Sequence, residues 1–137
     1  QTLLVLGHPY ILGDRFISGR IIQKLERLGV TTEWFSHTHH NIPDNLFKWD
    51  MCSKMYEKIS GLRNRSYAGV IQISSFNCGC DSILMDFIRT KLKEKSIPYM
   101  VLVLDEHSSS GWIDTRLEAF CESLRWHYAS SSNSNDG

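Results

Sequence analysis

Four short apolar segments alternate with longer stretches in which apolar residues recur at helical spacing, and this alternation limits the possible fold more than any other feature. The strand candidates are residues 3–7, 30–35, 69–73 and 99–104. The helix candidates are residues 15–28, 46–62, 81–95 and 113–128. Strands joined through helices run parallel in one sheet with helices on both faces. The sequence therefore predicts a three-layer, flavodoxin-like (Rossmann-like) α/β domain with about four strands in the order 2-1-3-4.

The size of the chain fits one such domain. It has 137 residues, of which 42% are apolar, enough for a single buried core. We expect residues 1–129 to form the domain and the small, polar residues 130–137 to be a disordered tail. Because a strand begins directly after Gln1, we also expect the domain to come from a longer polypeptide.

Charge and hydropathy argue against several classes of function. The 15 basic residues balance the 15 acidic ones, so nothing favours nucleic acid or an anionic membrane surface as a partner. No apolar run approaches the ~20 residues of a membrane helix, and no basic leader precedes the first strand. A Walker-type phosphate loop and a G-x-G-x-x-G motif are both missing from the sequence. We therefore expect a cytoplasmic protein that does not itself hydrolyse nucleotides.

Two thiols, Cys78 and Cys80, stand where the third strand gives way to a helix. We expect residues 74–79 to form a turn and Asp81 or Ser82 to cap the helix. A helix start favours negative charge such as a thiolate or an anionic cluster. The pair can ligate an iron–sulfur cluster or zinc, or exchange disulfides, but such metal sites need about four ligands. The alternative, with equal weight, is two small residues packed in a tight loop.

The other two cysteines are expected to be part of the hydrophobic core. Cys52 and Cys121 lie inside amphipathic stretches, where a free cysteine behaves as a small buried hydrophobe. Four cysteines without a secretory signal do not predict a disulfide framework.

Three loops rich in reactive groups should meet at one edge of the sheet. Residues 8–14, 74–81 and 105–111 follow strands one, three and four, whose carboxyl ends share the edge at which open α/β sheets bind ligands. They carry His8, Glu106 and His107 beside the cysteines, and Arg116 follows one turn into the last helix. We expect Arg116 and Glu118 to form a charge network with the last loop. The histidines of the loop after strand two are expected to be solvated; they are His37, His39 and His40.

Several motifs together resemble a known family. They are Gly7-His-Pro-Tyr10, Phe76-Asn-Cys-Gly-Cys-Asp-Ser82, Asp105-Glu-His107 and Thr115-Arg-Leu-Glu-Ala-Phe120. This set resembles the domain of unknown function associated with CoA-substrate-specific enzyme activases, which is related to 2-hydroxyacyl-CoA dehydratase and benzoyl-CoA reductase subunits. The likeness covers nearly the whole chain. It departs at Cys80, where the family usually has proline.

The resemblance implies that Cys78 is a ligand of a [4Fe–4S] cluster that relays an electron to an acyl-CoA substrate. Cys80 would be either a further thiol near that cluster or a substitution without a role of its own. The groups around the cofactor or substrate would be His8, Asp81, Ser82, Glu106, His107 and Arg116, the last as a positioning residue.

The remaining cluster cysteines and the activase ATPase would lie in neighbouring domains, so this chain alone should not be active. An acyl-CoA dehydratase or reductase component would be the partner. Two alternatives stay open, a non-catalytic docking module and a flavodoxin-like domain for a small ligand. The second is weakened because residues 8–14 lack the Ser, Thr and Gly donors that a phosphate would use.

Overall fold

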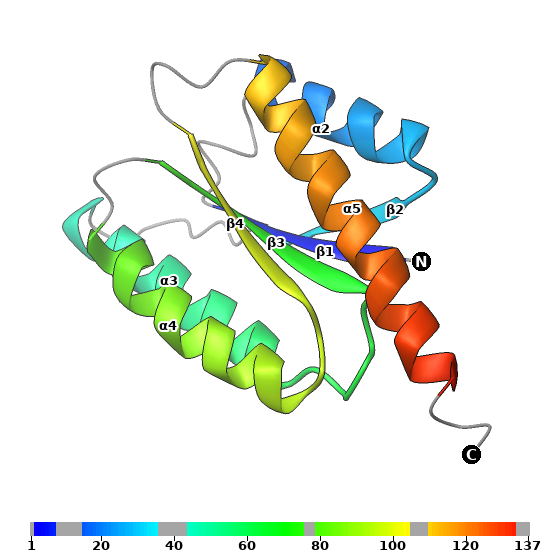
Figure 1. Cartoon of the computed structure of the whole chain (residues 1–137). Helices are drawn as coiled ribbons and strands as arrows, with labels where there is room; N and C mark the ends of the chain where they lie inside the picture. The colour runs from blue at the N-terminus through cyan, green and yellow to red at the C-terminus, as the bar shows by residue number, and fades with distance from the viewer. Residues whose placement is uncertain (1, 8–14, 36–43, 76–78, 105–109, 134–137) are drawn as a thin grey trace.

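The computed structural model describes residues 2–7, 15–35, 44–75, 79–104 and 110–133; within these, the side chains of residues 44–51, 75, 79–81, 110 and 133 are left out. Strands and helices alternate along the chain (Figure 1). The strands are β1 (Thr2–Gly7), β2 (Thr31–Phe35), β3 (Gly69–Ser75) and β4 (Tyr99–Leu104). The helices are α2 (Arg15–Arg27), α3 (Asp44–Ser60), α4 (Gly79–Glu94) and α5 (Ser110–Asn133).

The four strands form one parallel sheet in the order β2-β1-β3-β4, which confirms the predicted fold class and strand order. Val5 of β1 lies opposite Trp34 of β2 and Ile71 of β3, and Ile71 lies opposite Met100 of β4. The central strand β1 is buried from Leu3 to Gly7. Such a continuous apolar run is expected where helices cover both faces of a parallel sheet.

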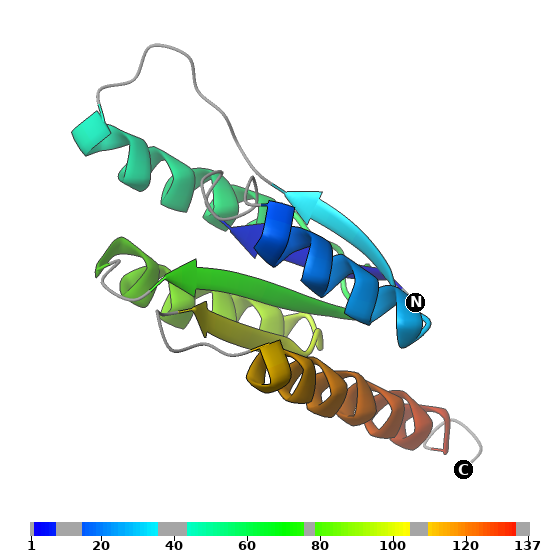
Figure 2. The ribbon, with the colours of Figure 1, turned by 90° about the horizontal axis from the view of Figure 1, so that it is seen from above.

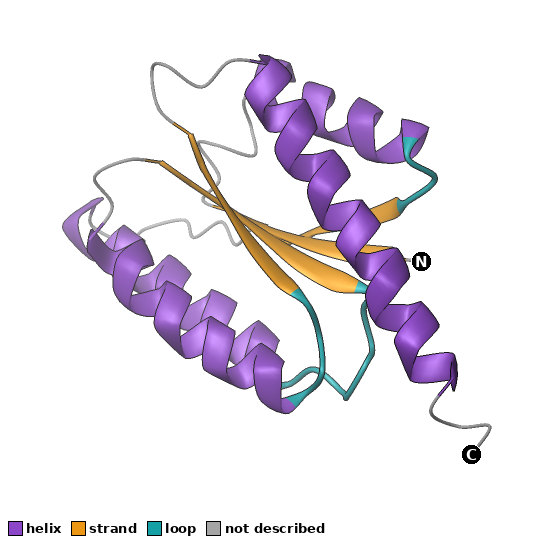
Figure 3. Cartoon of the chain, in the orientation of Figure 1, coloured by secondary structure: helices purple, strands orange, loops and turns teal. Residues whose placement is uncertain are grey.

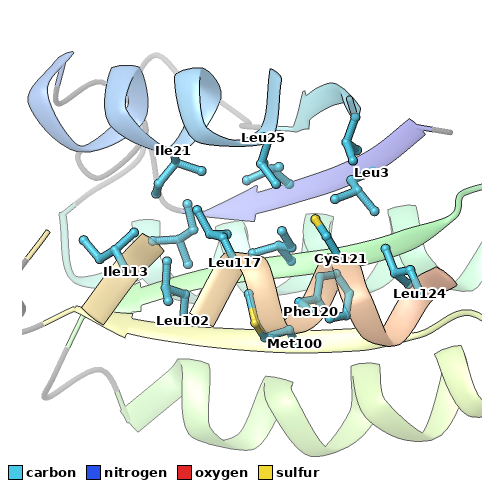
Figure 4. Packing of buried hydrophobic residues seen from close by; sticks show 14 residues of the cluster. Leu3, Ile21, Leu25, Met100, Leu102, Ile113, Leu117, Phe120, Cys121 and Leu124 are labelled. Carbon is cyan, nitrogen blue, oxygen red and sulfur yellow. The ribbon is translucent and has the colours of Figure 1, made fainter. Parts of the chain in front are cut away.

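Two helices cover each face of the sheet. α2 and α5 pack on one face, and α3 and α4 lie side by side on the other (Figures 2 and 3). Because successive strand residues point to opposite faces, the core divides into two clusters. Leu3, Val5 and Ile71 point towards α2 and α5, where Leu117 and Leu124 of α5 meet them (Figure 4). The cluster under α3 and α4 contains Leu4, Leu6, Val70, Met55, Ile59, Leu84, Ile88 and Leu92.

Helix α5 continues to Asn133 and so includes the first four residues of the expected tail. The hydroxyls of Ser130, Ser131 and Ser132 donate to carbonyls three or four residues earlier, at 2.6, 3.0 and 2.8 Å. A serine can be accommodated in a helix when its hydroxyl bonds in this way. Residues 134–137 lie outside the described residues.

Two other boundaries differ near the carboxyl edge of the sheet. β3 continues to Ser75 because it pairs with β4 as far as Leu104, so residues 74 and 75 are strand rather than turn. α4 begins at Gly79, which puts Asp81 and Ser82 in its first turn instead of at its cap.

The outer face of α4 carries two apolar side chains, although the apolar pattern of residues 81–95 alone would let both pack inward. Ile83 is 53% exposed and Phe87 is 56% exposed, while Leu84 and Ile88 fill the core position of the same turns. An i, i+4 stripe covers only one face of a helix, and residues one position earlier lie about 100° away. Phe87 instead meets the ring of Tyr56 on α3 edge-on, with 6.0 Å between ring centroids. Among the helices described, none is long and apolar enough to cross a membrane.

Candidate functional site at the carboxyl edge of the sheet

The carboxyl ends of β1, β3 and β4 lie next to one another. Gly7, the last residue of β1, pairs with Ile73, and Ser75 at the end of β3 pairs with Leu104 at the end of β4. The segments after these strands therefore leave from one edge, where the strand order reverses between β1 and β3. The starting points of the three predicted loops come together as expected. The loop residues His8, Cys78, Glu106 and His107 lie outside the described residues, and their roles stay predictions.

Helix α4 begins at this same edge, and three residues separate it from the end of β3. Its first turn contains Cys80, Asp81 and Ser82. The N–H groups of a first helical turn have no partner within the helix and form the positive end of its dipole. The edge is therefore electrostatically suited to a thiolate at residue 78 or 80. Of these three side chains the structure describes only Ser82, which is exposed.

Two polar side chains are buried in the central strand β3, and sequence reasoning missed both. Gln72 and Ser74 are 1% and 2% exposed. They alternate with Ile71 and Ile73, so they share the face of Val70, under α3 and α4. The hydroxyl of Tyr99 donates a hydrogen bond to the Gln72 amide oxygen. The sequence signal that could have revealed them is the polar residue at every second position of an otherwise apolar strand. Ser74 is one residue from the end of β3, at the candidate edge.

Cys52 of α3 is disulfide-bonded, which contradicts the prediction of a free thiol. Its predicted burial is confirmed, because the residue is 6% exposed and packs in the cluster with Leu84 and Ile88 of α4. The sequence alone could not reveal that α3 and α4 lie side by side. A disulfide needs two Cα atoms within about 7 Å, so only the tertiary fold decides which cysteines pair.

Cys121 of α5 is free and buried, as predicted. Burial raises the pKa of its thiol, and the nearby charge of Arg125 offsets only part of this rise. Figure 4 shows Cys121 on the inner face of α5. It belongs to the core cluster on the side of the sheet opposite Cys52.

Arg116 is oriented by β4 and by its own helix. Its guanidinium donates to the Val101 carbonyl at 3.4 Å and lies 5.9 Å from the centre of the Trp112 ring. Glu118 pairs with Lys24 of α2. Residues 105–109 lie outside the described residues, so the expected charge network with that loop and the positioning role of Arg116 stay predictions.

A [4Fe–4S] cluster needs about four ligands, and the described side chains can be compared with that requirement. In the described part of the chain, no three His, Cys, Asp or Glu side chains gather closely enough to hold a metal ion. Cys121 is buried on the other side of the sheet, and Cys52 can become a ligand only after its disulfide is reduced. The described residues therefore do not form a complete four-ligand site. His37, His39 and His40 lie outside the described residues.

What the geometry establishes is an α/β domain in which the ends of β1, β3 and β4 and the start of α4 lie at one edge of a parallel sheet. Comparison with known proteins finds no matching family model and no matching curated protein.

Proposed function

We propose that this chain is a domain of an activase-type or 2-hydroxyacyl-CoA dehydratase-type iron–sulfur protein, and that Cys78 contributes one thiolate ligand to a [4Fe–4S] cluster. The single observation that carries this proposal is the meeting of the ends of β1, β3 and β4 beside the first turn of α4. Cys78 immediately precedes that turn. Unpaired helical N–H groups stabilise the negative charge of a thiolate or of a cluster. When bound, such a cluster supplies one-electron transfer.

The other cluster ligands come from a second domain or a partner protein. Cys121 is enclosed by the core on the opposite side of the sheet, and Cys52 is already bonded to another sulfur. An acyl-CoA dehydratase or reductase component is the partner that fits the sequence resemblance. The role of this chain would then be to hold one edge of the cluster. Because Cys121 is free, the partner of Cys52 within the chain is Cys78 or Cys80, so the disulfide must be reduced before Cys78 serves as a ligand and Cys80 as an additional thiol.

The proposal is tested on the protein isolated without oxygen, together with its natural neighbours. We expect iron and acid-labile sulfide, and both should be lost in the Cys78→Ser variant. Cys121→Ser is the matched control, because it removes a thiol that lies in the core on the opposite side of the sheet, and it should keep its iron. A Cys78→Ser protein with unchanged iron and an unchanged electron paramagnetic resonance signal would refute the ligand role.

The disulfide at Cys52 favours a second candidate, a domain whose thiols serve structure while its surface docks another domain. The sequence has four cysteines and Cys121 is free, which leaves Cys78 and Cys80 as the candidate partners within the chain. Closing a loop of that size stabilises a fold by about 3–4 kcal/mol in the chain-entropy treatment.

Peptide mapping without reduction separates the two candidates. A Cys52 cross-link to residue 78 or 80 that resists reductant, in protein isolated without oxygen and free of iron, supports the structural role. Reduced thiols with bound iron support the cluster.

A further inference from the structure

A groove of about 490 Å³ opens at the end of the sheet opposite the candidate site. Its lining residues come from the last turns of α4, the segment that leads into β4 and the second half of α5. Its basic side chains are Arg89, Lys93 and His127, and its floor is formed by Ile97, Pro98 and Tyr99. This volume falls in the range of small-molecule sites.

The groove carries positive charge that the surrounding carboxylates offset only weakly. Throughout the described residues, Lys93 forms no ion pair. Arg89 pairs only with Asp86, at 3.6 Å and between exposed side chains, where an ion pair contributes little. Nε2 of His127 is shielded from solvent and finds no hydrogen-bond partner in the structure described. The formal net charge of the whole chain is zero, so the groove has a local excess of positive charge.

Neighbouring residues strengthen the same field. Between residues 89 and 98 the sequence has four basic side chains and one acidic side chain, Glu94, which pairs with Lys91. The backbone N–H of Arg65 donates to the Lys95 carbonyl at 3.3 Å, which brings a further cation to this end of the molecule. Clustered charge of one sign attracts an oppositely charged ligand and raises its local concentration.

The floor of the groove is apolar and held in place. Ile97 is buried in the core under α4, and Pro98 cannot donate a backbone hydrogen bond. The Tyr99 hydroxyl bonds to buried Gln72, which fixes the ring, and the Arg89 guanidinium lies 5.9 Å from the ring centre. A ligand that fits both parts of the groove has an anionic group joined to a flat apolar body.

We propose that this groove binds a small organic phosphate monoester, with the phosphate between Arg89 and Lys93 and the organic part against Pro98 and Tyr99. Arg and Lys are the side chains that bind phosphate oxygens through charge-assisted hydrogen bonds. The site is separate from the carboxyl edge of the sheet, so it does not depend on the proposed cluster.

Phenyl phosphate is the probe, titrated into the ¹⁵N-labelled 137-residue chain at low ionic strength and followed by NMR. We expect shifts confined to the amides of residues 89–99 and of those around His127. Inorganic phosphate and benzyl alcohol supply the charge and the ring separately, and each should bind more weakly. The dissociation constant should rise about tenfold in Arg89→Gln/Lys93→Gln, equivalent to one lost charge-assisted hydrogen bond.

The matched control is Lys91→Gln/Arg125→Gln, which removes two positive charges that are paired with Glu94 and Glu122 and lie outside the groove. It should change the affinity less than about twofold, because each of these two charges is already offset by its paired carboxylate.

An equal loss in the control would overturn the proposal, as would inorganic phosphate or benzyl alcohol binding as tightly as phenyl phosphate. Shifts that map to other elements would do the same. Should the double variant lose its fold by circular dichroism, Lys93→Gln alone, at an exposed position, decides the question. It should weaken binding by about threefold.

Discussion

Replacing Gly69 with alanine is the most direct probe of how tightly β3 packs beneath α5. A Cβ atom at Gly69 would lie 2.9 Å from Cζ of Phe120, 3.1 Å from Cδ2 of Leu3 and 3.3 Å from Cδ2 of Leu124. All three neighbours are buried in the core cluster under α5 (Figure 4), so none can swing into solvent. The added methyl group must therefore displace core side chains.

An extra methyl group in a packed core costs about 1–3 kcal/mol. For a domain of this length, each kcal/mol corresponds to roughly 3–6 °C in the melting temperature. We expect Gly69→Ala to lower the free energy of unfolding by that amount in urea titrations followed by circular dichroism, with an unchanged m-value. The size of this loss in unfolding free energy shows how far the Phe120 ring can move to accommodate the added methyl group.

Gly19→Ala is the matched control, because nothing lies within 4 Å of the added Cβ on α2. A helix gains about 0.5–1 kcal/mol when glycine becomes alanine, so this variant should be more stable than the parent. Gly69→Ala combined with Phe120→Leu should lose less than the two single changes added together, because the smaller side chain makes room. A Gly69→Ala protein as stable as the parent, or strictly additive losses, would refute the close packing described here.

Other predictions concern single groups. Tyr99→Phe leaves the buried Gln72 amide without its donor and should cost about 1–3 kcal/mol of unfolding free energy, which Tyr99→Phe/Gln72→Leu should largely restore. Ser96→Gly should raise the unfolding free energy by about 0.5–1 kcal/mol, because Ser96 has a φ of 55° in the left-handed region; a drop in the urea midpoint would contradict this. Burial raises the Cys121 pKa in the folded state, so its contribution is complete below the ordinary thiol pKa and is lost as pH rises through the raised pKa. Urea midpoints between about pH 7 and 10 should then fall more steeply for the parent than for Cys121→Ala, and parallel curves would argue against this linkage.

The local sequence pattern predicted most of the fold, but it did not predict which face of a helix packs against the neighbouring elements. Leu84 and Ile88 could be recognised from their four-residue spacing, whereas Ile83 and Phe87 fit a helical stripe equally well and are exposed. The serines after residue 129 resembled a polar tail, since their composition does not reveal hydroxyls bonded back to helix carbonyls.

The candidate site divides in the same way. The sequence was enough to infer that three loops leave from one edge of the sheet, because parallel strands joined by helices must all point the same way. These loops are residues 8–14, 74–81 and 105–111. The disulfide at Cys52 could not be inferred, since it depends on which other cysteine the tertiary fold brings close to α3. The groove between α4, β4 and α5 has the same origin, because Lys93, Tyr99 and His127 belong to three different elements.

By itself, the sequence determined the alternation of strands and helices, the parallel sheet and its strand order, because these follow from apolar periodicity and the handedness of crossovers. Only the tertiary structure decided that Cys52 is bonded, that Gln72 and Tyr99 are partners, and that basic side chains surround a groove. The physical reason is that periodicity records which side of an element is buried. It carries no information about which residue of another element lies opposite.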